Sequence, residues 1–582
     1  MISPGAPIPR GSKPPVIFLN GYQNTCPVQF SDTFGIADQV LQSNGQVSLF
    51  FNSCSLPQTA SIEDLGAAFG TFLAGLRYQD GQAVDEVDIV AHSMGGLVLR
   101  SYLSGKQNTA GVFQPPAVTH IRRAVFLATP HFGSGVAIVF GIPTTQVQEL
   151  ASGSRFLFDL ATWNQGADDL RGVDAVAAVG NGGIGFGLGT MPGFDDGVVA
   201  LTSGSLRFYL PGRTQVVPFC HVNGGGLVTL AGLCPAEAHG IANIQSATQD
   251  AARIMVSFFN GTDEWKSVGT PAENDRFLSV DGGLIVAARS ASDTSLPLTS
   301  VTAGMLGSSK TLNLSSAGDI GYTDLFPAGV VTLSAVSGAA TATTTVTLTA
   351  GGTEPYTVKP GPFVVRVLPA AANIFPLSLA PGMFVSVYGT NLAATTAQAA
   401  ALPLPPQLSD AQVLLNGSPL GLNYASGIQI NAVLPDTTSG LQQLMLRNSS
   451  GSHTINVLIE AAVPTIFTQD SSGSGPAAAR NALDNGVITP AHPLHGGDYV
   501  ELFATGLGAT TLKDGLAYAI QQPTVSIGGQ NCPVSFAGRA PGFVGVDQIN
   551  CQVPGGIASN SAAPVVIVSG NRTSNTATLA EQ

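Results

Sequence analysis

The chain has 582 residues, enough for about four domains at roughly 150 residues each. Hydrophobic residues make up 44% and charged residues only 10%, and glycine (70) and proline (38) are abundant, a profile that suits extracellular β-rich modules with many turns. The net charge of −13 is spread thinly without a basic patch, which argues against a nucleic acid partner. No apolar run approaches the ~18 residues of a transmembrane segment.

Residues 14–262 alternate short apolar runs with amphipathic stretches, which predicts an α/β domain: a mostly parallel sheet with helices on both faces. The expected strands show little polar alternation, as strands buried on both faces do. A helix is expected after Ser61, its N-cap, because Ile62, Leu65 and Phe69 recur at helical spacing. The expected strands span 15–20, 47–52, 87–93, 122–130, 173–180 and 214–222, and a closing helix is expected over 239–259.

After about residue 262 the helical periodicity nearly vanishes, and β-branched runs alternate with Gly, Pro and Ser. We expect a β-sandwich module over 263–370. An internal repeat follows: "PGMFVSVYGTNLAAT" (381–395) matches "GGDYVELFATGLGAT" (496–510), and "IQINAVLP" (428–435) matches "DQINCQVP" (547–554). The repeat predicts two related β-modules, over 371–470 and 471–582.

The "GTNLA" and "QINxxxP" stretches of these two modules resemble immunoglobulin-like C-terminal modules of secreted soil-bacterial proteins. The resemblance implies all-β sandwiches that carry no chemistry of their own. We expect such modules to bind a surface or a polymer.

Six cysteines fall into three local couples, Cys26 with Cys54, Cys220 with Cys234, and Cys532 with Cys551. Six cysteines allow 15 connectivities, so this pairing rests on proximity alone. Paired cysteines indicate an oxidising compartment. The N-terminal stretch lacks the apolar core of a signal peptide, but the cysteines favour a secreted or cell-surface protein. No C-x-x-C pair is present, so a zinc site is not expected.

The stretch "VDIVAHSMGGLV" (87–98) places Ser93 where a buried strand stops and a helix starts. A nucleophilic serine needs such a sharp strand-to-helix turn, with small residues two positions before and after it. Ala91 and Gly95 meet that need. Two backbone N–H groups must then stabilise an oxyanion, and the candidates are those of Met94 and of Tyr22 in the loop "NGYQ".

The partners of such a serine follow it in the order Asp, His. Asp195 and Asp196 in "GFDDGVV", and His239 in "EAHGIANI", occupy suitable places. Together with "AHSMGG" and "FLATPHFGS" (126–134), these stretches resemble α/β-hydrolases of the bacterial lipase and esterase type. The resemblance implies a triad of Ser93, Asp196 and His239, an oxyanion hole of Tyr22 and Met94, and no metal or organic cofactor.

Rival residues are present for each partner. Asp195 competes with Asp196, and His221 competes with His239, but His221 falls within an expected strand rather than on the loop after it. His92 is expected to bond locally, and His131 to form part of the pocket wall. The family usually has His-Gly where this chain has Asn20-Gly21; the oxyanion donors there are backbone groups, so activity should survive the change.

The resemblance implies a secreted serine hydrolase that cleaves carboxylic esters, with a small-molecule or lipid ester as substrate. The segment at about 133–194 carries apolar helix-like stretches and is expected to be a cap over the site. Because every candidate residue precedes position 240, residues 1–265 alone are expected to hydrolyse small esters. The alternative is an adhesion or polymer-binding protein built on a vestigial hydrolase scaffold.

Overall fold

The structure, a computed structural model, describes residues 1–3, 5–23, 25–57, 59–136, 144–184, 194–224, 233–269, 278–305, 308–371, 377–557 and 559–581. The chain divides into two compact units. The first comprises Met1–Trp163, Ala167–Ser290 and Thr294–Pro360, and the second comprises Asn164–Gly166, Ala291–Asp293 and Gly361–Gln582.

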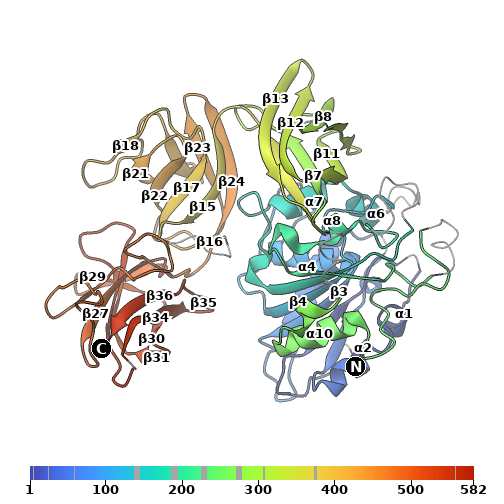
Figure 1. The fold of residues 1–582 in the computed structure, drawn as a ribbon, viewed down its shortest axis with the longest axis horizontal. Coiled ribbons are helices and arrows are strands. Elements are labelled where there is room, and N and C mark those ends of the chain that lie inside the picture. Colours follow the sequence, from blue (N-terminus) through green and yellow to red (C-terminus); the bar gives the residue numbers. More distant parts are fainter. Residues whose placement is uncertain are drawn as a thin grey trace. The chain divides into compact units, whose positions relative to one another are not determined.

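A parallel sheet with the strand order β2-β1-β3-β4-β5-β6 forms the centre of the N-terminal part (Figure 1). Each strand coincides with an expected apolar run, and the sheet with its flanking helices confirms the predicted fold class. The strands are β1 (Val16–Leu19), β2 (Ser48–Phe51), β3 (Val87–His92), β4 (Ile121–Leu127), β5 (Asp174–Gly180) and β6 (Thr214–Val217).

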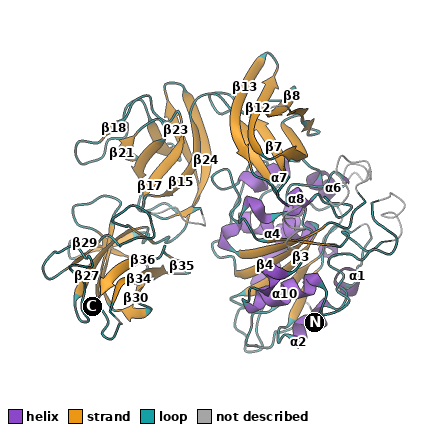
Figure 2. Cartoon of the chain, viewed as in Figure 1, coloured by secondary structure: helices purple, strands orange, loops and turns teal. Residues whose placement is uncertain are grey.

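The described helices all lie in the first unit, around this sheet (Figure 2). None of them is both long and apolar enough to cross a membrane. The α-helices are α1 (Phe30–Phe34), α2 (Ala37–Ser43), α3 (Ile62–Gly75), α4 (Met94–Ser104), α6 (Thr145–Leu150), α7 (Arg155–Thr162), α8 (Leu201–Gly204) and α10 (Asp250–Asn260). The short 3₁₀ turns are η1 (Ser53–Ser55), η2 (Leu170–Gly172), η3 (Leu206–Phe208) and η4 (Glu264–Ser267).

Alternate side chains of the central strands enter two separate cores, because successive residues of a strand face opposite sides of the sheet. On β1, Ile17 and Leu19 pack in one core with residues of α3 and α4. Val16 and Phe18 pack in the other core with residues of α1, α2 and α10. The sheet is therefore buried on both faces, which explains the continuous apolar runs in its sequence.

Two elements have boundaries that differ from the sequence prediction. The last strand stops at Val217 rather than at residue 222, because Pro218 has no N–H to continue the ladder. The closing helix starts at Asp250 rather than at residue 239. The described residues between these two elements, 218–224 and 233–249, form no helix or strand.

The predicted cap over 133–194 is also corrected. Its second half contains β5, which pairs with β4 and β6 in the centre of the sheet and cannot cover it. Between β4 and β5 the described elements are α6, α7 and η2. Residues 137–143 and 185–193 of the predicted cap lie outside the described part of the chain.

The β-sandwich that follows belongs to the same compact unit as the α/β part. Its two sheets have the orders β10-β11-β7-β14 and β13-β12-β8-β9, and they enclose their own apolar core. The strands are β7 (Asp281–Ala288), β8 (Ser300–Met305), β9 (Ser308–Thr311), β10 (Asn313–Leu314), β11 (Ile320–Pro327), β12 (Gly329–Ser337), β13 (Ala340–Leu348) and β14 (Thr353–Val358).

A shared apolar cluster joins this sandwich to the α/β part. Ile285 of β7 and Ile320 of β11 pack with Phe132 and Phe158, all of them at most 4% exposed. The hydroxyl of Thr202 in α8 also donates to the carbonyl of Asp324, at 2.8 Å. The sandwich thus covers apolar side chains of the α/β part that would otherwise meet water.

The second unit contains two further pairs of β-sheets, one pair in each of the two repeats. The first pair has the orders β15-β17-β22-β21-β18 and β16-β24-β23-β19-β20, around one core. Its strands are β15 (Phe363–Pro369), β16 (Ser378–Leu379), β17 (Phe384–Thr390), β18 (Ala397–Gln398), β19 (Gln412–Leu415), β20 (Ser418–Pro419), β21 (Gly421–Ala425), β22 (Gln429–Val433), β23 (Gly440–Asn448) and β24 (Gly451–Ile459).

The second pair has the orders β25-β27-β33-β32-β29-β28, with β26 beside β27, and β31-β30-β34-β35, with β36 beside β34. Its core contains the disulfide between Cys532 and Cys551. The strands are β25 (Thr465–Ile466), β26 (Ala479–Asn481), β27 (Tyr499–Thr505), β28 (Thr510–Lys513), β29 (Leu516–Ala519), β30 (Thr524–Ile527), β31 (Gln530–Cys532), β32 (Val534–Arg539), β33 (Asp547–Gln552), β34 (Asn560–Ser569), β35 (Arg572–Thr573) and β36 (Ala577–Glu581).

The sequence repeat reappears as a repeat of strand pairing. In the first copy Val385 of β17 lies opposite Ala432 of β22. In the second copy the equivalent residues, Val500 of β27 and Cys551 of β33, lie opposite each other. The two segments matched by sequence therefore pair with each other, in the same register, in both copies.

The shared cluster changes the expected behaviour of a truncated chain. We predict that residues 1–360 fold as one unit, whereas residues 1–265 melt ~10 °C lower or aggregate. Exposing Phe132 and Phe158 to water lowers the free energy of unfolding by about 3–6 kcal/mol. Each kcal/mol lowers the melting temperature of a domain of this size by about 2–4 °C. Differential scanning fluorimetry of the two truncated chains measures the difference. Equal melting temperatures would contradict the role given to the shared cluster.

Candidate active site

Ser93 sits on a strained turn between β3 and α4. Its φ of 56° and ψ of −130° lie in a region that a non-glycine residue adopts only when the surrounding structure holds it there. The neighbouring backbone comes very close. A Cβ added at Gly95 would lie 2.4 Å from the carbonyl oxygen of Leu19, and one at Gly21 would lie 2.7 Å from the Cβ of Ser93. The small residues around Ser93 are therefore required by space.

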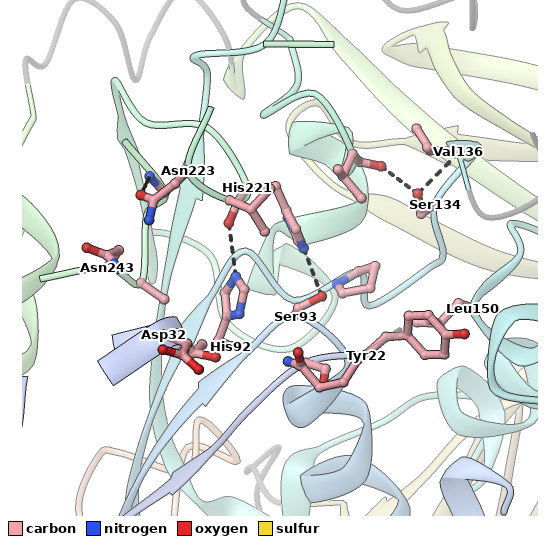
Figure 3. Close-up of a pocket in the computed structure, with 18 of the residues that line it drawn as sticks. Tyr22, Asp32, His92, Ser93, Ser134, Val136, Leu150, His221, Asn223 and Asn243 are labelled. Carbon is pink, nitrogen blue, oxygen red and sulfur yellow. Dashed lines mark hydrogen bonds between the residues drawn. The ribbon is translucent and has the colours of Figure 1, made fainter. Parts of the chain in front are cut away.

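A chain of hydrogen bonds runs from Ser93 through a histidine to a carboxylate (Figure 3 shows its first link). The Ser93 hydroxyl lies 2.8 Å from Nε2 of His221. Nδ1 of His221 lies 2.8 Å from Oδ2 of Asp196. His221 and Asp196 are both buried, at 5% and 1% exposure. The imidazole is thus oriented by the carboxylate on one side and meets the hydroxyl on the other.

Backbone donors fix the carboxylate of Asp196. Its Oδ1 accepts hydrogen bonds from the N–H groups of Val198 and Val199, at 3.0 and 2.7 Å. The neighbouring Asp195 instead accepts the N–H of Gly197, at 2.8 Å. The structure therefore brings Asp196, and not Asp195, to the histidine.

His239 is not the histidine beside Ser93, and that part of the sequence prediction is wrong. His239 is exposed, and its backbone carbonyl accepts the N–H of Cys220 at 3.1 Å. The physical reason is the early end of β6 at Val217, which places His221 on the loop after the last strand. Pro218 is the signal in the sequence that could have shown this, because it excludes a strand running through to His221.

The three predicted disulfide pairs are confirmed, and two of them lie next to this site. Cys220 precedes His221 in the chain, and the Sγ of its partner Cys234 lies 3.3 Å from the carbonyl oxygen of Asp196. The N–H of His221 donates to that same carbonyl, at 2.9 Å. The disulfide therefore closes the loop that carries His221 and places Cys234 against the backbone of Asp196.

His92, at the end of β3, makes a hydrogen bond to the backbone of the loop that carries His221. Its Nε2 donates to the carbonyl of His221 at 3.1 Å, so that nitrogen carries the proton (Figure 3). Complete burial, with a smaller contribution from His221, lowers the pKa of His92 to about 3. His92 therefore stays neutral near neutral pH.

His131, expected in the pocket wall, lies instead in the interior. It packs between the rings of Phe126 and Phe208 and is fully buried. That burial, followed by the charge of Arg100, holds the pKa of His131 well below its usual range.

The loop with Tyr22 passes close to Ser93, and two contacts attach it to the turn at Ser53. The carbonyl of Gly21 accepts the hydroxyl of Ser53, at 3.1 Å. The disulfide from Cys26 to Cys54 links the same loop to the turn at Ser53. Tyr22 lines the cavity beside Ser93 (Figure 3). Met94 begins α4, and the N–H groups of a helix's first turn have no partner within the helix.

A cavity of about 380 Å³ opens onto Ser93 and His221. Apolar side chains from the segment after β4 and from α6 form one part of its lining, among them Val136, Val147 and Leu150. All three wall residues fall within the segment 133–194 predicted to cover the site, so this part of the predicted cap does border the cavity. Asp32, Asn223 and Asn243, which line another part, carried no motif.

Helix α6 also borders a second cavity, of about 600 Å³, and Val147 lines both. On this side Glu149 lies beside the buried Glu63 of α3, whose Oε1 is 3.4 Å from Nζ of Lys106. Burial and, next, the charge of Glu63 raise the pKa of Glu149 to about 8. Its Oε2 accepts the N–H of Ile62, at 2.8 Å. A wall helix of the first cavity is thus attached to α3 through a carboxyl group that resists ionisation.

No protein-family model matches the chain, and neither does any curated protein sequence. Among solved structures, the phospholipase PlaB from Legionella pneumophila is similar with 13% identity and a TM-score of 0.45, over 60% of this chain and 94% of that one. The mature lipase BlEst2 from Bacillus licheniformis is similar with 21% identity and a TM-score of 0.27, over 37% of this chain and 89% of that one.

The surface glycan-binding protein SGBP-B from Bacteroides ovatus is similar with 14% identity and a TM-score of 0.20, over 51% of this chain and 65% of that one. The chemical capability of the chain is therefore inferred from its own residues.

The disulfide beside His221 generates a stability prediction. The free energy of unfolding of the Cys220→Ser/Cys234→Ser variant should be about 3 kcal/mol lower than that of the wild type. This is the stabilisation expected when a disulfide closes a loop of about 15 residues. Its melting temperature should fall while circular dichroism retains the helix and strand signal. The loop of His221 should loosen, so Ser93 should react more slowly with an acylating probe. Cys532→Ser/Cys551→Ser, in the other unit, is the matched control and should leave that rate unchanged. Both thiols of Cys220 and Cys234 found free in the oxidised protein would contradict the pairing.

Glu149 generates a pH prediction. An unfolded glutamate ionises near pH ~4.3, whereas the folded carboxyl has a pKa of about 8. Between these values the folded chain binds the extra proton, so stability falls as pH rises and levels off above about 8. Glu149→Gln keeps an acceptor for Ile62 and cannot ionise. Its melting temperature relative to the wild type should rise from pH 4 to pH 9, whereas the exposed Glu264→Gln should show no trend. A constant difference for Glu149→Gln would contradict the prediction.

Proposed function

We propose that this chain is a serine hydrolase that cleaves carboxylic esters. Ser93 is the nucleophile, His221 the general base, and Asp196 the carboxylate that orients it. The observation that carries the proposal is the 2.8 Å contact between the Ser93 hydroxyl and Nε2 of His221, a distance suited to proton transfer. The strained turn at Ser93 and the apolar cavity beside it support the same reaction.

The reaction follows from these positions. Oγ of Ser93 attacks the ester carbonyl carbon while its proton passes to Nε2 of His221, and Asp196 stabilises the imidazolium through Nδ1. The oxyanion accepts hydrogen bonds from the backbone N–H groups of Tyr22 and Met94. The alcohol oxygen then takes the proton from Nε2 and leaves, and the acyl group stays on Ser93. Water attacks the acyl carbon while its proton passes to Nε2 of His221. The bond to Oγ of Ser93 then breaks, Oγ takes the proton back from Nε2, and the acid leaves.

The acyl chain lies along Val136, Val147 and Leu150, because an apolar wall favours an apolar chain. The three disulfides support an extracellular site of action. The immunoglobulin-like modules retain the role expected from the sequence, which is attachment to a surface or polymer. Attachment would raise the local concentration of substrate without taking part in the chemistry.

The histidine pair provides a matched test. Ser93→Ala and His221→Ala should each lower kcat on p-nitrophenyl octanoate by roughly 10⁴-fold, the scale for loss of a triad member. His239→Ala should retain it within about twofold, because that side chain is exposed and away from Ser93. A fluorophosphonate probe should label the wild type and not Ser93→Ala. A wild type that neither turns over the ester nor binds the probe would instead identify a vestigial scaffold. Loss of activity in His239→Ala with retention in His221→Ala would overturn the assignment of the base.

A further inference from the structure

The cavity beside Ser93 has two unlike halves (Figure 3). Val136 and Leu150 lie on one side of Ser93 and His221, and Asp32, Asn223 and Asn243 lie on the other. If the proposed ester cleavage holds, on which this inference rests, the alcohol oxygen must reach Nε2 of His221 to receive its proton. Because the proposed acyl chain lies along the apolar half, the alcohol part of the substrate extends from His221 into the other half, which is the polar one.

The two asparagines of the polar half present hydrogen-bond donors. Oδ1 of Asn223 accepts the N–H of Gly240, at 2.9 Å. Oδ1 of Asn243 accepts Nε2 of Gln245. Within the described part of the chain, every hydrogen bond that either side chain makes uses Oδ1, so the Nδ2 group of each remains available to a ligand.

Asp32 presents an acceptor and a negative charge. Its Oδ2 caps α1 by accepting the N–H of Gln29, at 2.9 Å, and its side chain is exposed. Oδ1 has no hydrogen bond within the described residues. Asp32 is also the one Asp, Glu, Lys or Arg among the described residues that line this cavity. No lysine or arginine there would balance an anionic group on the alcohol.

A hydroxyl group fits this mixture of donors and acceptor better than other alcohol substituents do. It can donate to Asp32 and accept from an asparagine Nδ2 at the same time. A cationic group would satisfy the carboxylate but leave the N–H donors unmatched. A phosphate would accept from the donors but meet the charge of Asp32 unpaired.

We propose that the polar half of the cavity, lined by Asp32, Asn223 and Asn243, binds an alcohol with neighbouring hydroxyl groups. The substrate is then an ester of an apolar acid with a vicinal diol. Asp32 determines this specificity through its free oxygen and its charge, and Asn223 and Asn243 donate to the same hydroxyls. A sugar and glycerol share this chemistry. Esters whose alcohol part is anionic are disfavoured.

Four octanoate esters test the proposal on the full chain: methyl octanoate, glucose 6-octanoate, 1-octanoylglycerol and 1-octanoylglycerol 3-phosphate. The wild type should prefer the two uncharged diol esters over the methyl ester by about tenfold in kcat/KM, through KM, as expected for one to two added hydrogen bonds. A preference for glucose over glycerol, or the reverse, identifies the source of the diol, and either supports the proposal.

Asp32→Asn is the decisive variant, because its Oδ1 can still cap Gln29 while the charge is lost. Relative to its kcat/KM on methyl octanoate, it should lower kcat/KM on the diol esters about fivefold and raise it on the phosphate ester about threefold. A general structural defect would move all four substrates in the same direction. Asn243→Asp keeps the acceptor for Gln245, removes the Nδ2 donor and adds a negative charge, so relative to methyl octanoate it should lower turnover of the diol esters and of the phosphate ester.

Methyl octanoate turned over as well as the diol esters would overturn the inference and leave the proposed ester cleavage intact. Equal shifts on all four esters in Asp32→Asn would do the same. A wild type that hydrolyses none of them would overturn the proposed function itself, and this inference with it.

Discussion

The conformation of Ser93 is the constraint on which the arrangement of the site depends. A positive φ at a serine is costly, on the order of 1–3 kcal/mol, and it persists because the sheet and α4 hold both ends of the turn. The N–H of Ser93 donates to the carbonyl of Leu127 in β4, at 3.0 Å. The close approach of Gly21 and Gly95 leaves the turn no room to relax. The hydroxyl at the cavity is thus positioned by the packing of the α/β core.

The described residues of the loops that carry His221 and Asp196 form no helix or strand, so other contacts hold these two side chains in place. His92 holds the carbonyl of His221, the N–H of His221 holds the carbonyl of Asp196, and the Cys220–Cys234 disulfide closes the loop behind them. The first contact joins the end of β3 to the loop after β6, and the second joins the loops after β6 and β5. The disulfide closes the loop after β6 on itself. In α/β folds, ligand sites lie in the loops at the carboxyl ends of parallel strands. Here hydrogen bonds join these loops to one another.

The sequence predicted the elements whose signal is local. Strands buried on both faces appear as apolar runs, and Ser93 could be found because a strand, a serine and two glycines stand together. The cysteine pairs also followed from proximity along the chain. The internal repeat predicted related modules, and the common register of β17–β22 and β27–β33 follows from the same repeat.

Features that depend on distant parts of the chain escaped the sequence analysis. The choice between His221 and His239 depended on where β6 ends. That end is set by Pro218, which has no N–H to continue the strand pairing. The attachment of the β-sandwich to Phe132 and Phe158 was also missed, since an apolar residue shows that it is buried but not what covers it. The lining of the cavity by Asp32 on α1 needed the fold itself, because no motif marks it.

The neutral state of His92 has a consequence for the charge distribution of the site. The rings of His92 and His221 are centred 5.0 Å apart, close enough for two positive charges to repel each other strongly in a buried environment. Because burial keeps the pKa of His92 at about 3, the His92 ring carries no positive charge near neutral pH. An imidazolium formed at His221 would then pair with the Asp196 carboxylate, 2.8 Å from its Nδ1, without repulsion from a charged His92.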